Sequence, residues 1–119
     1  MTFAEYQAGV MRTASGMNYE KYGALMNAAL GITGEGGEVA DLIKKATFQG
    51  HSLDCEHLIE ELGDCLYYIA LAADGLGTTL ESIAEYNNAK HKKRYPNGFE
   101  VDRSINREKN NGADKGREK

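Results

Sequence analysis

Two pairs of acidic residues, each embedded in a strongly apolar stretch, are the part of this sequence best suited to chemistry. Glu35 and Glu38 lie three residues apart, and so do Glu61 and Asp64. On an α-helix, residues three apart lie about one turn apart on the same side, so each pair presents two carboxylates together. Isolated carboxylates are costly to bury, whereas two such pairs on neighbouring helices can bind a divalent cation. The pattern predicts a metal site formed by all four acids.

The predicted ligands are all carboxylates, which limits the choice of metal. Hard oxygen donors favour Mg²⁺, with Mn²⁺ as a possible substitute, over zinc or copper. Mg²⁺ usually completes its coordination shell with water and substrate phosphates, which indicates phosphate chemistry. The alternative is that the acids are boundary residues paired with lysines such as Lys44 and Lys45. A zinc site is disfavoured because the histidines and cysteines of this region have no usable spacing: His51, Cys55, His57 and Cys65.

A second polar group follows further along the chain. Asn87, Lys90 and Arg94 are spaced i, i+3 and i+7, which places them on one face of a helix. The two cations could hold the terminal phosphates of a substrate, or they could be solvent-exposed charges that interact favourably with the helix dipole. Tyr68, one turn beyond Asp64, could border a base or sugar, although packing in the core is favoured.

Helical spacing of apolar residues predicts the elements that position these groups. The expected helices cover about residues 3–14, 24–48, 54–74 and 79–94, and no alternating strand pattern competes with them. The predicted fold is therefore all-α, a four-helix bundle-like single domain over residues 1–100. Residues 101–119 form a charged C-terminal tail that is expected to be partly disordered, with a disordered end from Glu108.

Four glycines interrupt the second predicted helix around Glu35. Each costs roughly 1 kcal/mol relative to alanine inside a helix, so either the helix breaks or another group approaches its backbone closely. The apolar stripe keeps its phase across the interruption, which favours a continuous helix. The glycines are Gly31, Gly34, Gly36 and Gly37.

Length and composition exclude several classes of protein. A chain of 119 residues with 41% hydrophobic residues suits one small domain, whose thin core favours oligomerisation. The net charge of −4 argues against a general nucleic-acid binder. The longest apolar run, Leu66 to Ala73, is too short to span a membrane, and the N-terminus lacks the pattern of a secretion signal. We therefore expect a cytoplasmic protein without a membrane association.

Three motifs in sequence order resemble the MazG-like branch of the all-α nucleotide pyrophosphatases. They are Gly34-Glu-Gly-Gly-Glu38, then Glu61-Leu-Gly-Asp64, then Asn87-x-x-Lys90-x-x-x-Arg94-Tyr-Pro. The resemblance covers about residues 25 to 100. It implies Mg²⁺-dependent hydrolysis of a nucleoside triphosphate to a monophosphate and pyrophosphate, by a homodimer or homotetramer.

The resemblance also implies roles for individual residues. Glu35, Glu38, Glu61 and Asp64 match the metal-binding acids of the family, and Asn87, Lys90 and Arg94 match positions implicated in phosphate contacts. Some members carry a further glutamate just before the first acid, where this chain has Gly34. The base that orients the attacking water is therefore open between Glu38, Glu60 and the metal itself. A helical interaction module without catalysis remains the alternative from another functional class.

Overall fold

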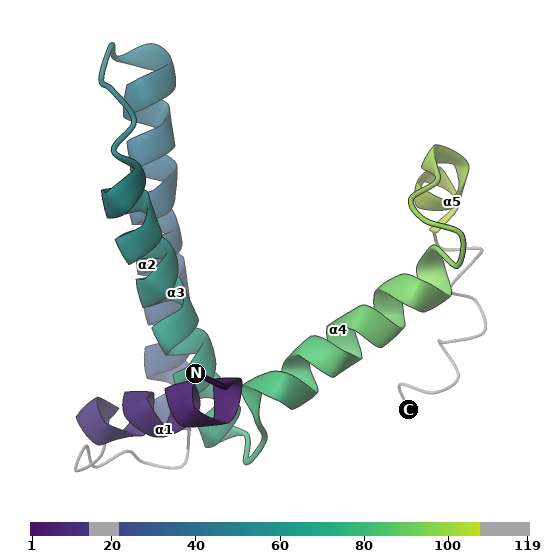
Figure 1. The fold of residues 1–119 in the computed structure, drawn as a ribbon, viewed down its shortest axis with the longest axis horizontal. Coiled ribbons are helices and arrows are strands. Elements are labelled where there is room, and N and C mark those ends of the chain that lie inside the picture. The colour runs from purple at the N-terminus through teal and green to yellow at the C-terminus, as the bar shows by residue number, and fades with distance from the viewer. Residues whose placement is uncertain (15–21, 108–119) are drawn as a thin grey trace. The chain divides into compact units, whose positions relative to one another are not determined.

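The helical spacing seen in the sequence is realised as five helices in the described part of the chain. The computed structural model describes residues 1–14 and 22–107. Its helices are α1 (Phe3–Ala14), α2 (Gly23–Phe48), α3 (Cys55–Gly75), α4 (Leu80–Arg94) and α5 (Val101–Ile105) (Figure 1). The four predicted helices and the all-α fold class are confirmed, and α5 is an addition that the sequence did not predict.

Local sequence signals explain where several of these helices begin and end. Thr2 and Glu5 form the predicted capping box: the Thr2 N–H donates to Glu5 Oε2 at 2.6 Å, and the Glu5 N–H donates to Thr2 Oγ1 at 3.1 Å. Asp54 caps α3 by accepting the His57 N–H at 3.0 Å. Gly50, with φ of 71°, supplies the left-handed backbone that follows the end of α2.

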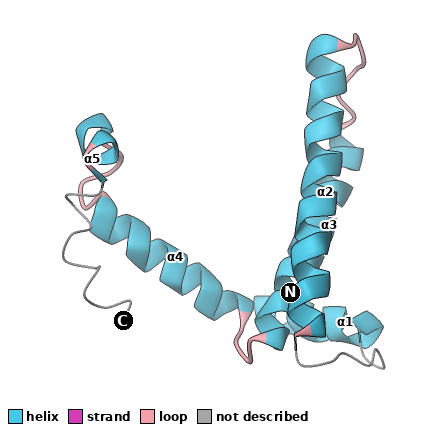
Figure 2. Cartoon of the chain, turned by 180° about the vertical axis from the view of Figure 1, so that it is seen from behind, coloured by secondary structure: helices cyan, strands magenta, loops and turns pink. Residues whose placement is uncertain are grey.

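The chain divides into two compact units, residues 1–81 and 82–119, which are described separately here. In the first unit, α2 and α3 run antiparallel and lie side by side (Figures 1 and 2). The core is small, with Leu71 of α3 packed against Ala28 of α2 and Ala14 of α1. The side-chain amide of Gln7 joins α1 to the start of α4, because it donates to the Thr78 carbonyl at 3.1 Å and accepts the Leu80 N–H at 3.0 Å.

The second unit contains most of α4 followed by a tight turn and α5. Gly98, with φ of 91°, completes the turn after Pro96, and the Tyr95 and Phe99 rings lie 5.3 Å apart. The predicted domain boundary near residue 100 stays a prediction, and the predicted disordered end from Glu108 falls outside the described residues. Among the helices of the described residues, none combines the length and apolar character needed to cross a membrane.

The glycine-rich stretch is helical throughout, as the phase of the apolar stripe predicted. Gly31, Gly34, Gly36 and Gly37 all lie within α2. Only Gly31 of these four has a close neighbour, the ring of Tyr68 on α3. One glycine thus permits a helix contact, while the other three leave open space where a side chain would be.

Candidate metal centre

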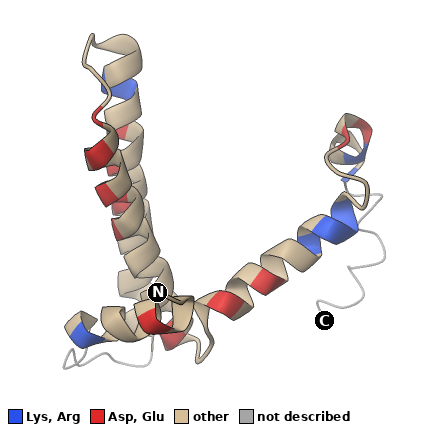
Figure 3. Cartoon of the chain, viewed as in Figure 1, with Lys and Arg blue, Asp and Glu red and all other residues tan. Residues whose placement is uncertain are grey.

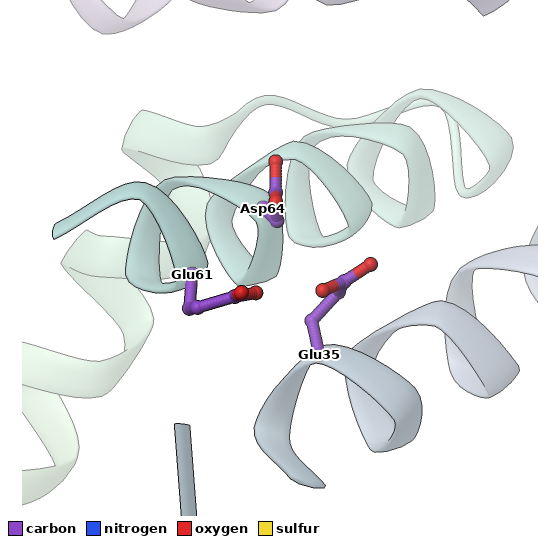
Figure 4. A group of neighbouring side chains, drawn as sticks. All are labelled: Glu35, Glu61 and Asp64. Carbon is purple, nitrogen blue, oxygen red and sulfur yellow. The ribbon is translucent and has the colours of Figure 1, made fainter. Parts of the chain in front are cut away.

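Three of the four predicted metal ligands converge between α2 and α3. Glu35 projects from α2, and Glu61 and Asp64 project from successive turns of α3 (Figure 4). Each offers a carboxylate oxygen, and these oxygens all lie within 4.8 Å of one another. The antiparallel packing of the two helices therefore assembles an acidic cluster, defined here as Glu35, Glu61 and Asp64.

The acidic cluster is electrostatically unfavourable without a cation. Partial desolvation raises the pKa of the half-buried Glu35, and its hydrogen bond with Glu61 and the negative charges of Asp64, Glu61 and Glu38 raise it further. The lysines that could have neutralised the acids are engaged elsewhere, since Lys44 and Lys45 pair with Asp41 at 3.6 and 2.6 Å. The lysine-paired alternative is thus not the arrangement that these two lysines adopt.

The spacing of the carboxylates suits a small divalent ion. Mg²⁺ binds oxygens at about 2.0–2.1 Å, so ligands on opposite sides of an octahedral ion lie about 4.2 Å apart. Oxygens within 4.8 Å of one another reach that separation through small side-chain rotations. The donor set contains oxygen only, which matches the preference of Mg²⁺ and Mn²⁺.

The two other acids proposed for this site lie outside the acidic cluster. Glu38 is exposed one turn beyond Glu35, near enough to raise the pKa of Glu35 but not a member of the ligand group. Glu60 is exposed on α3 next to Glu61. Their roles as a fourth ligand or as the base stay predictions.

A close contact one turn away from the acids sets the distance between the helices. Tyr68 lies four residues after Asp64, Gly31 lies four before Glu35, and the Tyr68 ring rests directly on the Gly31 backbone. A Cβ at Gly31 would meet atoms of that ring at 2.3–2.5 Å. Packing of Tyr68 in the core is confirmed, while its contact with a substrate stays a prediction.

The model of the MazG nucleotide pyrophosphohydrolase domain matches residues 25–99 of the chain. That segment contains the acidic cluster and both flanking helices, and it is more than half of the sequence. The chain belongs to this family. Neither a curated protein nor a solved structure is significantly similar to it.

The predicted phosphate-binding residues of this MazG domain all lie on α4. Asn87 and Lys90 are exposed, and Arg94 is partly buried at the last position of the helix. The C-terminal end of α4 is strongly basic (Figure 3), which complements the helix dipole. The Arg94 carbonyl accepts a hydrogen bond from Arg103 Nε at 2.6 Å, so α5 holds the end of α4.

His57 is a neighbour of the acidic cluster that sequence reasoning missed. Its Nε2 lies 2.9 Å from Glu61 Oε1, one helical turn away on α3. We had considered His57 only as a zinc ligand. The i, i+4 spacing of His57 and Glu61 was the available signal, because such residues meet on a helix surface.

The raised pKa of Glu35 predicts how the metal-free MazG domain responds to pH. A carboxyl whose pKa is higher in the folded protein than in the unfolded chain stabilises the fold at low pH, and that contribution is lost as the pH rises through the folded pKa. At pH 7, Glu35→Gln should therefore have a higher Tm than the wild-type domain in EDTA. The difference should shrink as the pH falls toward 4.5, the ordinary value for glutamate.

Thermal unfolding across this pH range, followed by circular dichroism, measures the difference. Saturating Mg²⁺ should reverse the order, because the cation stabilises only a protein that binds it. A Tm difference that is independent of pH would contradict the assigned strain at Glu35.

Proposed function

We propose that this MazG domain hydrolyses a nucleoside triphosphate, ribo or deoxy, to the monophosphate and pyrophosphate in a Mg²⁺-dependent reaction. The observation that carries the proposal is the convergence of Glu35, Glu61 and Asp64 between two packed helices. Family membership supports nucleotide substrates. The role that fits is control or cleaning of a cytoplasmic nucleotide pool.

The roles of the side chains follow from their chemistry. Glu35, Glu61 and Asp64 would hold the cation, which when bound supplies Lewis-acid charge stabilisation at the phosphates.

Glu38 or Glu60 would accept a proton from the water that attacks the α-phosphorus. The bond from that phosphorus to the bridging oxygen breaks, and pyrophosphate leaves with the electron pair. Lys90 and Arg94 would neutralise its charge, and the Asn87 amide would donate to a phosphate oxygen.

A panel of ribo- and deoxyribonucleoside triphosphates tests the proposal. With Mg²⁺ we expect equal amounts of monophosphate and pyrophosphate, and EDTA should stop both. Release of inorganic phosphate and a diphosphate would contradict cleavage at the α-phosphorus. A helical module without catalysis would give no turnover and no thermal stabilisation by Mg²⁺ with nucleotide.

We also propose that the domain works as a homodimer or homotetramer. Long apolar side chains of α2 and α3 are largely exposed in the single chain, including Leu30 at 67%, Ile59 at 68% and Leu62 at 52%. Contiguous exposed apolar surface of this kind marks an association face. Sedimentation equilibrium should give at least twice the chain mass of 13.0 kDa; the mass of one chain would refute the assembly.

Arg94→Ala tests the predicted phosphate contact. Hydrogen bonds to charged groups contribute about 1.5–3 kcal/mol, so KM for triphosphates should rise roughly 10- to 100-fold. Steady-state kinetics with triphosphate and monophosphate-ester substrates measure the effect. Lys92→Ala, an exposed cation of the same helix end, is the matched control. Equal losses with and without terminal phosphates would contradict the role of Arg94.

A further inference from the structure

The side chain of His57 connects the beginning of α3 to the acidic cluster. Its backbone N–H donates to the capping carboxylate of Asp54 at 3.0 Å, which fixes the backbone of the first turn. Its ring Nε2 lies 2.9 Å from Glu61 Oε1. The Glu61 side chain is only 13% exposed, whereas that of His57 is 47% exposed. His57 thus approaches an enclosed carboxylate from the solvent side.

The chemistry of the contact fixes its direction. An ionised carboxylate can only accept hydrogen bonds, so Nε2 must carry the proton and donate it to Glu61. A donor at one oxygen restricts rotation of the carboxylate group about its terminal bond. Carboxylates that bind metals are commonly held by such hydrogen bonds, and losing one typically weakens metal binding 10- to 100-fold.

We propose that His57 is a positioning residue that holds the carboxylate of Glu61 in the orientation that binds the divalent cation. The inference rests on the proposed metal site, and it assigns a role to a residue outside the ligand set. The competing explanations are different in their consequences. A simple helix-surface pair would only stabilise α3 slightly, and a cationic imidazole would oppose metal binding.

The test is direct binding of Mn²⁺ to the full chain without nucleotide, followed by electron paramagnetic resonance at one fixed pH. His57→Ala should weaken Mn²⁺ binding about 10-fold or more. His57→Gln should restore most of the affinity, because the glutamine amide N–H reaches a position close to that of Nε2. His51→Ala, an exposed histidine just before α3, is the matched control and should bind as the wild type does.

Each contrary result has a definite meaning. Unchanged Mn²⁺ affinity in His57→Ala would reduce the contact to a helix pair, and tighter binding would make His57 an opposing charge. A His57→Gln variant as weak as His57→Ala, with an unchanged circular dichroism spectrum, would exclude the hydrogen bond as the cause. Failure of the wild type to bind Mn²⁺ would overturn the metal site itself, together with the inference.

Discussion

Glu61→Gln is expected to reduce Mg²⁺-dependent hydrolysis at least about 100-fold. The substitution keeps the shape of the side chain but removes the charge of the most enclosed member of the acidic cluster. Charge stabilisation by a catalytic metal is worth several kcal/mol, and each 1.36 kcal/mol changes a rate tenfold. Initial rates of pyrophosphate release and Mn²⁺ binding measured on the same preparation test this directly.

Two further substitutions make the result specific. Glu56→Gln removes an exposed acid from the first turn of α3 and should leave both quantities near their wild-type values. Glu38→Gln separates two possible roles of that residue. Loss of turnover by about 10²- to 10⁴-fold with unchanged Mn²⁺ affinity would make Glu38 the base, whereas loss of both would make it a ligand. Turnover that survives Glu61→Gln would show that the acidic cluster is not the active site.

Gly31→Ala is expected to destabilise the protein and to damage the acidic cluster although it touches none of the acids. The new methyl group would lie 2.3–2.5 Å from the Tyr68 ring, whereas ordinary contacts begin at 3.4 Å. The contacted atoms Cγ, Cδ1 and Cε1 belong to the ring itself, so no flexible chain end can move aside. The helices must therefore separate by roughly 1 Å, and overpacking of this kind costs about 1–3 kcal/mol.

The same displacement should reach the site, because Glu35 and Asp64 lie one turn from the contact. A shift of about 1 Å in a catalytic group can cost roughly 100-fold in rate. Chemical denaturation and hydrolysis rates measure the two effects. Gly37→Ala is the matched control: its Cβ would meet no atom within 4 Å, so the better helix former should stabilise the protein by about 0.5–1 kcal/mol.

A double-mutant cycle identifies the cause. If the clash with Tyr68 is responsible, Gly31→Ala combined with Tyr68→Ala should be less destabilised than the sum of the two single changes. Additive effects would mean that the contact between Gly31 and Tyr68 does not set the distance between α2 and α3.

Those parts of the structure that depend on neighbouring residues could be predicted from the sequence. The capping box of Thr2 and Glu5 is local, and so is the helical phase that carries α2 through its glycines. Glu35, Glu61 and Asp64 were also predictable, because each edges an apolar stripe and apolar stripes of consecutive helices pack together.

Features that depend on the register between helices could not be predicted in the same way. No spacing within α2 or α3 indicates that Tyr68 meets Gly31, nor that Glu38 lies outside the ligand group while Glu35 lies inside it. The short helix α5 was missed for another reason. Its five residues make too few turns to show an apolar period, and the hydrogen bond from Arg103 to the Arg94 carbonyl depends on the intervening turn.

The open glycines of α2 have a consequence for local unfolding. Gly34, Gly36 and Gly37 weaken the middle of the helix without a compensating contact, so the backbone that carries Glu35 should open more readily than the two ends. A cation held by Glu35 and α3 would oppose this opening. Amide hydrogen exchange in the segment 33–38 should therefore be slowed by Mg²⁺ more than exchange elsewhere in α2, which makes this segment a sensor of site occupancy.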